Sequence, residues 1–196
     1  MFSPSQIISF RETQTSQLRI IISGGPGTGK STLLDALKAT GELCFPEVSR
    51  DLIREQSARG GTLLPWEDLP GFAAECAERM RAQLAAAGQS RRAFFDRGLP
   101  DLIAYLRHGG CAPAPELSCE SRVYAPVVFL APPWPKIFVN DTERPQTFQE
   151  SVALHEQLLC AYRECGFDIQ LLPQVPVVSR VDFVLTQLAA RSFLPA

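Results

Sequence analysis

The chain has 196 residues, 45% of them hydrophobic and 20% charged, which is ordinary for a globular protein and long enough for one domain with a substantial core. Its formal net charge of -2 argues against a general nucleic-acid-binding or membrane-binding surface, while leaving room for a local basic groove. The 6 cysteines include no C-x-x-C pair and no histidine cluster accompanies them, so we expect reduced, mostly buried thiols in a cytoplasmic protein rather than a zinc site.

The N-terminal part of the chain combines an irregular segment with an apolar strand. Residues 1–17 show no clear hydrophobic period, and we interpret them as a leader without the features of a signal peptide. Residues 18–22 are rich in β-branched side chains and end at glycines, which predicts a buried parallel strand. A helix is expected over 30–40, with Gly41 placed to stop it. We expect residues 18–196 to form a single domain.

Beyond this first helix, short apolar segments alternate with segments of helical spacing. Thr147 and Ser179 are the candidate N-caps of the last two helices. Alternating strands and helices predict an α/β fold, in which a parallel sheet is covered by helices on both faces. Ligands bind such a sheet outside the carboxyl ends of its strands. The expected strands are 43–45, 93–95, 127–130 and 167–172, and the expected helices are 50–59, 72–87, 99–108, 148–165 and 181–190.

A glycine-rich loop lies between the first strand and the first helix. Residues 24–31 match G-x-x-x-x-G-K-[ST] at every fixed position, and the flanking strand and helix disfavour a chance glycine-rich turn. Glycines allow backbone N–H groups to converge on phosphate oxygens, while Lys30 supplies a positive charge for the β- and γ-phosphates. Ser31 supplies a hydroxyl ligand for Mg²⁺. The residues expected to bind the triphosphate are Gly25, Pro26, Gly27, Thr28, Gly29, Lys30, Ser31 and Thr32.

Motifs of other nucleotide-binding classes are missing from the sequence. The N-K-x-D motif with which GTPases read their base does not occur, so ATP is favoured over GTP. The strand expected at 127–130 has no acidic pair at its end, where an ATPase motor would carry one. A chain of 196 residues also leaves little room for the helical lid domain of a large AAA+ motor.

Charged residues follow the second and third expected strands directly. Asp96 is placed to hold a Mg²⁺-bound water or to accept a proton from an attacking hydroxyl. Arg97 is placed to hold the phosphate being transferred or an anionic group of the acceptor. Glu47 and Arg50 are candidate substrate-binding residues, with Glu47 hydrogen-bonding sugar hydroxyls or orienting the acceptor. The structural alternatives are helix capping for Asp96, a surface ion pair for Arg97 and a favourable helix-dipole position for Glu47.

A polar segment after the fourth expected strand is a candidate lid. In kinases, a lid at this place closes over ATP, excludes water and supplies arginine to the phosphoryl group. Within 136–147, Arg144 is the first candidate for that role and Lys136 the second, with a plain surface loop as the alternative. Trp66 and Trp134 are candidates for stacking on a base or for packing inside the protein.

With these residues identified, the chain resembles small P-loop proteins grouped as AAA-domain ATPases, and nicotinamide riboside kinases in shape. The resemblance runs from Arg19 to about Leu188, and its motifs are 24–32, 46–50, 95–98 and 140–147. Asp96-Arg97 is also similar to the acid–Arg pair of deoxyribonucleoside and thymidylate kinases, and Glu47 to their sugar-contacting Glu. The resemblance implies a three-layer, nucleotide-kinase-like P-loop NTPase fold with five parallel strands flanked by helices. Nucleotide kinases often carry several arginines in this lid, whereas the candidate lid of this chain has a single one, Arg144.

Two functional hypotheses follow from these residues. The first is an ATP- and Mg²⁺-dependent kinase of a small nucleoside-like acceptor, with Ser31 and Asp96 at the metal. Its candidate catalytic residues are Lys30, Asp96, Arg97 and Arg144. The alternative is an ATPase with a regulatory or partner-coupled role and no small-molecule acceptor, in which water is the nucleophile. A pure nucleotide-binding module is a third hypothesis. None of the three involves nucleic acid or a membrane.

Overall fold

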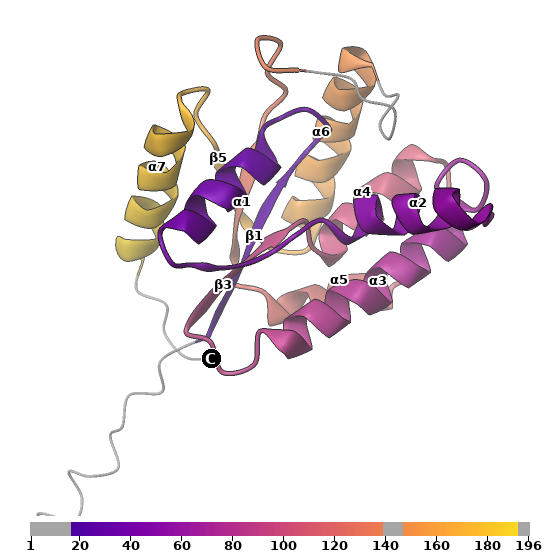
Figure 1. Cartoon of the computed structure of the whole chain (residues 1–196), viewed down its shortest axis with the longest axis horizontal. Helices are drawn as coiled ribbons and strands as arrows, with labels where there is room; N and C mark the ends of the chain where they lie inside the picture. Colours follow the sequence, from indigo (N-terminus) through magenta and orange to yellow (C-terminus); the bar gives the residue numbers. More distant parts are fainter. Residues whose placement is uncertain (1–16, 139–146, 192–196) are drawn as a thin grey trace, which may run out of the picture.

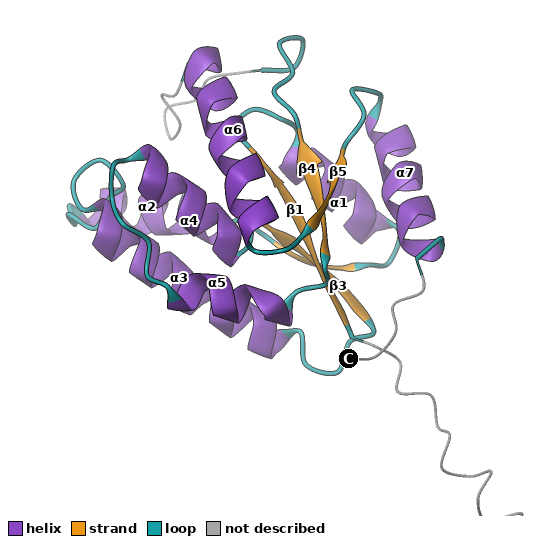
Figure 2. Cartoon of the chain, turned by 180° about the vertical axis from the view of Figure 1, so that it is seen from behind, coloured by secondary structure: helices purple, strands orange, loops and turns teal. Residues whose placement is uncertain are grey.

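The computed structural model describes residues 17–138 and 147–191, and the structural statements that follow refer to those residues. Their strands form one sheet with the order β2-β3-β1-β4-β5, and all of its pairings are parallel (Figure 2). The carboxyl ends of the strands therefore meet at the same edge. The strands are β1 (Leu18–Gly24), β2 (Leu43–Phe45), β3 (Arg92–Asp96), β4 (Val127–Ala131) and β5 (Asp168–Leu171).

Helices cover both faces of the sheet, which confirms the predicted three-layer α/β fold (Figure 1). One face is covered by α1 (Lys30–Ala39) and α7 (Val177–Ala189), which pack against each other. The other face carries a larger group of helices and a 3-10 helix. These are α2 (Val48–Arg59), α3 (Leu69–Ala86), α4 (Leu99–His108), α5 (Glu116–Glu120), η3 (Ser121–Val123) and α6 (Phe148–Glu164).

The uninterrupted apolar run of β1 is explained by this double cover. Ile20, Ile21 and Ile22 are all fully buried, yet they belong to two different clusters. Ile20 and Ile22 pack in the cluster of α1 and α7, whereas Ile21 packs on the opposite face. Phe94 and Phe95 of β3 divide in the same way. Successive side chains of a strand point to opposite faces, so a strand buried on both faces needs apolar residues at every position.

The helix ends show where local sequence signals were sufficient. Thr147 caps α6 as predicted, because its side chain accepts a hydrogen bond from the backbone N–H of Glu150 across 3.2 Å. The predicted cap at Ser179 is wrong, since Ser179 lies inside α7 and Pro176 is the N-cap. Pro fixes a backbone angle that suits a helix start, and this signal took precedence over the serine. Two short helices in the connection to β4, α5 and η3, were not predicted from the sequence.

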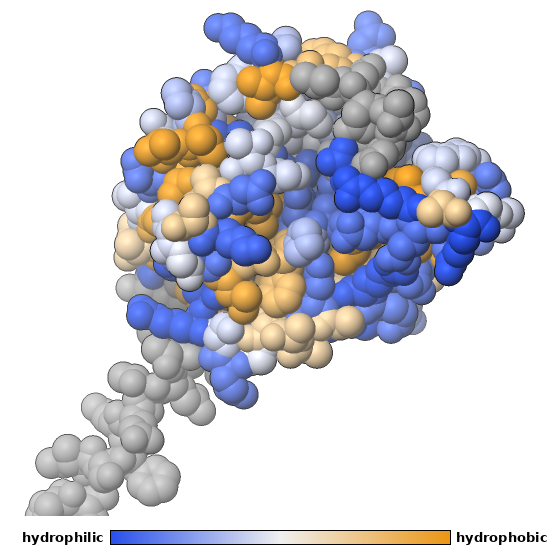
Figure 3. Space-filling model, viewed as in Figure 1, coloured by the Kyte–Doolittle hydropathy of each residue, from blue (hydrophilic) through white to orange (hydrophobic). Residues whose placement is uncertain are grey.

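The burial of the cysteines differs from what the sequence predicts. Of the six cysteines, Cys76 is buried, Cys119 and Cys160 are exposed, and the others are intermediate, so the prediction of mostly buried thiols is wrong. No group of three or more His, Cys, Asp or Glu side chains that could hold a metal ion occurs among the residues that the structure describes. No described helix is long and apolar enough to cross a membrane. Hydrophilic side chains gather over α2 on the face shown in Figure 3.

Candidate functional site

The glycine-rich loop joins the carboxyl end of β1 to the first turn of α1. Gly24, Gly27 and Gly29 have φ angles of 143°, 69° and 79°, a range that side chains disfavour. A Cβ atom on Gly24 would also lie only 2.6 Å from the carbonyl oxygen of Ala131 in the neighbouring strand β4. These glycines therefore allow a tight turn into α1, and the N-terminus of a helix is a favourable place to bind phosphate.

Polar side chains of the loop fold back onto its own backbone. The ammonium of Lys30 donates to the carbonyl oxygen of Gly25 across 2.8 Å, so the positive charge lies directly at the loop. Thr28 Oγ1 donates to the same carbonyl oxygen across 2.9 Å. A glycine-rich loop with an ammonium at the N-terminus of a helix fits the negative charge of a triphosphate.

Two side chains that the sequence analysis did not identify hold the loop from outside. Ser151 of α6 donates to the carbonyl oxygen of Pro26 across 3.2 Å, and Arg180 of α7 donates to that of Thr28 across 3.3 Å. Arg180 is buried, which lowers its pKa, and its guanidinium lies 6.0 Å from the ring centre of Trp134. Neither residue has a local sequence signal, because each reaches the loop from an element far along the chain.

Ser31 and Asp96 meet at the edge of the sheet. The hydroxyl of Ser31, in the first turn of α1, donates to Asp96 Oδ2 across 3.3 Å. Asp96 is the last residue of β3, which pairs directly with β1, and its side chain is buried. A hydroxyl and a carboxylate are hard oxygen donors, so this pair fits Mg²⁺. The acidic residue that was missing after β4 is thus supplied by β3.

Arg97 lies at the centre of a buried ion-pair network. Its Nε donates to Glu47 across 3.0 Å, and its Nη1 donates to the carbonyl oxygen of Gly24 across 3.0 Å and to Asp101 across 3.3 Å. Burial acts to lower the pKa of Arg97, but the surrounding negative charges, above all that of Glu47, outweigh it and hold the pKa above its ordinary value. The backbone of Arg97 is left-handed, with a φ of 75°, a conformation that costs about 1–3 kcal/mol for a residue other than glycine.

Asp101 belongs to the same network and was not identified from the sequence. Its side chain is fully buried and accepts hydrogen bonds from Ser23 Oγ at 2.7 Å, from the Gly98 backbone N–H at 3.0 Å and from Tyr162. Together with Arg97, four donors surround one carboxylate. An acidic residue three positions after a helix start normally indicates only a cap, so the sequence shows the capping role but not the burial.

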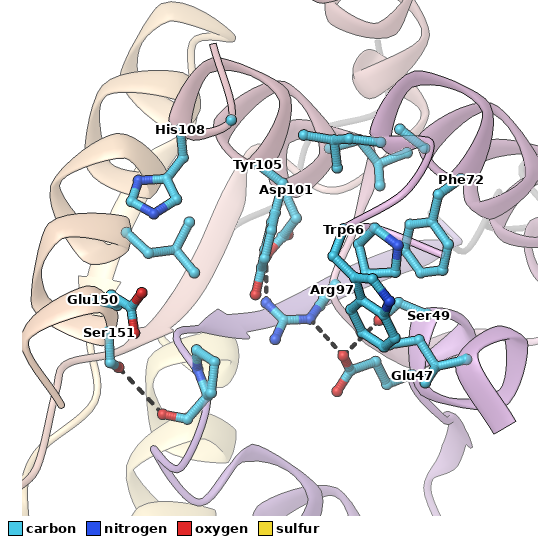
Figure 4. A pocket seen from close by; sticks show the side chains of 18 of the residues that line it. Glu47, Ser49, Trp66, Phe72, Arg97, Asp101, Tyr105, His108, Glu150 and Ser151 are labelled. Atoms are coloured by element: carbon cyan, nitrogen blue, oxygen red, sulfur yellow. Dashed lines mark hydrogen bonds and ion pairs between the residues drawn. The ribbon is translucent and has the colours of Figure 1, made fainter. Parts of the chain in front are cut away.

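A cavity of about 290 Å³ lies beside the loop, between α2, α3, α4 and α6. Figure 4 shows Arg97 near its centre, with Trp66 and Phe72 on one side and Ser151 on the other. The cavity adjoins the glycine-rich loop, because Pro26 is part of its lining. Its polar lining residues include Glu47, Ser49, Arg97, Asp101, His108, Glu150 and Ser151, and its large aromatic ones are Trp66, Phe72 and Tyr105.

A second cavity of about 240 Å³ is lined by Ser31, Asp96 and Arg50. Glu47 is part of the lining of both cavities, whereas Asp96 occurs only in the described lining of the second. The structure thus brings Ser31, Asp96, Glu47 and Arg97 together at neighbouring strand ends. Lys136 is exposed, and Arg144 lies outside the described residues.

Comparisons with known proteins agree with this geometry. A sequence profile described as AAA domain matches residues 19–180. Shikimate kinase from Acinetobacter baumannii in complex with shikimate has a similar structure, with a TM-score of 0.59 and 17% identity over 92% of this chain and 97% of that chain. Deoxyadenosine kinase from M. mycoides with bound dATP gives a TM-score of 0.52 and 15% identity over 88% and 100% of the respective chains.

The same deoxyadenosine kinase with the products dCMP and dCDP gives a TM-score of 0.57 and 17% identity, over 89% of this chain and 100% of that chain. No curated protein sequence matches the chain significantly. At these identities the structural similarities establish the fold alone, which is that of small P-loop kinases.

Proposed function

We propose a function for this chain, which belongs to the AAA domain family. It is an ATP- and Mg²⁺-dependent kinase of a small, hydroxyl-bearing, nucleoside-like acceptor. One observation carries the proposal. The larger cavity adjoins the phosphate loop through Pro26 and shares Glu47 as a lining residue with the smaller, metal-side cavity. A cavity in that place allows an acceptor hydroxyl to approach the terminal phosphate of a nucleotide held by the loop.

The donor side of the site consists of the loop, Lys30, Ser31 and Asp96. The loop N–H groups and the ammonium of Lys30 are assigned to the phosphates of ATP. Ser31 and Asp96, which are already hydrogen-bonded to each other, are assigned to Mg²⁺. When bound, the metal neutralises charge that develops on the phosphate oxygens. With these assignments Asp96 binds the metal and needs no direct contact with the acceptor.

The acceptor side is assigned to Glu47. Its carboxylate accepts hydrogen bonds from Ser49 Oγ across 2.6 Å and from Arg97 across 3.0 Å, which fix its position at the junction of the two cavities. Glu47 is placed to orient the acceptor hydroxyl and to accept its proton, as the hydroxyl oxygen bonds to the γ-phosphorus of ATP and ADP leaves. Arg50 and Arg97 remain assigned to the substrate site, and Arg144 to the lid.

The similar structures support a small acceptor, because they are named as kinases of shikimate and of deoxyadenosine. The test is to measure ADP formation by the purified chain with ATP and Mg²⁺, with and without a panel of nucleosides and nucleotides. A kinase forms ADP in step with a phosphorylated acceptor. If no acceptor raises ADP formation above background, the proposal fails. Steady hydrolysis that acceptors leave unchanged would favour the alternative, a partner-coupled ATPase.

A further inference from the structure

Charge is unevenly balanced around the larger cavity. Its described lining contains the carboxylates of Glu47, Asp101 and Glu150, the guanidinium of Arg97 and the imidazole of His108. Hydrogen bonds from Thr147, first of all from its backbone N–H, lower the pKa of Glu150 and so favour its charged form. Three carboxylates against one guanidinium and one imidazole leave a surplus of negative charge, which the neutral side chains of Trp66, Phe72 and Tyr105 do not offset.

The guanidinium of Arg97 is already compensated. It contacts carboxylate oxygens of both Glu47 and Asp101, and the remaining bond from Nη1 goes to the backbone at Gly24. Its planar face lies 5.1 Å from the ring centre of Tyr105. An incoming anion that pairs with this guanidinium must therefore come close to the carboxylate of Glu47. Like charges in a partly buried site repel each other.

Asp101 cannot give up its position to a ligand. Its two oxygens hold donors from β1, α4 and α6 through Ser23, Gly98 and Tyr162. Displacing this carboxylate would leave these buried donors without their acceptor. Asp101 is thus a fixed part of the cavity wall, and Glu47 is held there by Ser49 and Arg97.

We propose that the acceptor site selects molecules without an anionic group, so that it takes an uncharged or cationic nucleoside and rejects the corresponding nucleotide. This inference rests on the proposed function and names the substrate class of the same site. The rings of Trp66, Phe72 and Tyr105 give the cavity an aromatic wall, which suits a flat base and also favours a positively charged one. The surplus carboxylates favour the same charge.

The experiment measures binding and turnover separately. Thymidine and cytidine are compared with their 5′-monophosphates on the full chain saturated with Mg²⁺ and a non-hydrolysable ATP analogue, by calorimetry. We expect the nucleosides to bind at least about 100-fold more tightly than the monophosphates. Equal binding, tighter binding of the monophosphates, or no binding of either nucleoside would overturn the inference. Selective binding of nucleosides without ADP formation in the ATP assay would instead leave it standing and refute the kinase.

Two isosteric variants test whether charge is the cause. Glu47→Gln releases Arg97 from one of its carboxylates, so the preference for nucleoside over monophosphate should shrink by about 10-fold or more. Glu150→Gln retains the capping box of α6 and removes a more exposed charge, so the preference should shrink by less. If the preference is unchanged in both variants, the carboxylates do not set it and the inference is wrong.

Discussion

The hydroxyl of Ser31 and the carboxylate of Asp96 lie 3.3 Å apart, although 65 residues separate them in the sequence. They meet because β1 and β3 are neighbours in the sheet and Asp96 lies opposite Ile22, near the end of β1. The first prediction follows from this pair. Asp96→Asn should reduce kcat for ADP formation by about 100-fold or more, because a neutral amide holds Mg²⁺ far less well than a carboxylate. Steady-state kinetics over a Mg²⁺ titration measure the change.

Ser31→Thr is the matched control for this variant. Threonine keeps the hydroxyl at the same place and satisfies the motif, so activity should stay within about 10-fold of the wild type. Urea unfolding of both variants separates loss of chemistry from loss of fold. Full activity of Asp96→Asn at ordinary Mg²⁺ concentrations would remove Asp96 from the metal site.

Lys30→Ala is expected to abolish turnover while leaving the fold intact. The ammonium of Lys30 lies at the loop, where it is assigned to the β- and γ-phosphates, and its hydrogen bond is to the loop's own backbone. Removing it should lower kcat/KM by about 100-fold or more. Arg163→Ala removes the exposed positive charge of a residue that lines neither described cavity, and it should retain activity. Unchanged turnover by Lys30→Ala would contradict the assignment.

The order of strands and helices could be predicted because burial on both sides leaves a local signature. The apolar runs at Ile20–Ile22 and Phe94–Phe95 mark strands that are covered on both faces. The phosphate loop has its own motif, and the charged residues at strand ends followed from the rule that ligands bind there. For these features, a local sequence pattern predicts the strand or the loop, and the structure confirms it.

The network around Arg97 could not be predicted, because its members are far apart in sequence. Arg97 and Glu47 are separated by 50 positions, and Asp101 and Tyr162 by 61. No periodicity or motif records that these side chains are buried together. The sequence therefore indicated that Arg97 is charged and near the site. It did not indicate that the carboxylates of Glu47 and Asp101 already pair with its guanidinium.

Asp101→Asn should destabilise the protein strongly. The substitution retains the shape of the side chain but removes the charge that balances Arg97, and its amide N–H₂ opposes a donor such as Ser23. Breaking a buried ion pair in this way costs about 3–5 kcal/mol in the free energy of unfolding. Asp51→Asn is the control, since Asp51 pairs with Arg54 at the surface and should cost less than about 1 kcal/mol. Urea titrations measure both, and equal small losses would show that the network contributes little.

The variants Gly24→Ala and Gly41→Ala distinguish two costs of an added Cβ atom, which are backbone strain and a steric clash with neighbouring atoms. Both glycines have positive φ angles, 143° and 93°, but a Cβ on Gly24 would lie 2.6 Å from the carbonyl oxygen of Ala131, whereas nothing lies within 4 Å of one on Gly41. Gly41→Ala should cost about 1–2 kcal/mol, from conformation alone. Gly24→Ala should cost about 3 kcal/mol or more and distort the phosphate loop. Similar unfolding free energies for the two variants would show that β4 yields to the added methyl group.

His155 should make the protein sensitive to mild acid. Burial lowers the pKa of His155 below its ordinary value of 6.5, and its Nδ1 is buried without a hydrogen-bond partner among the described residues. Between the lowered pKa and 6.5, the unfolded chain binds a proton that the folded chain does not, so the free energy of unfolding falls as the pH falls through this window.

His155→Gln removes this titration, so the variant should lose less stability than the wild type between about pH 7.5 and about pH 5.5. His108→Gln, which changes the other histidine of the chain at the surface, should retain the wild-type loss because it leaves His155 in place. Urea unfolding of the three proteins at the two pH values gives the comparison. If His155→Gln and the wild type lose the same free energy, the acid sensitivity comes from carboxylates, and burial of His155 does not govern it.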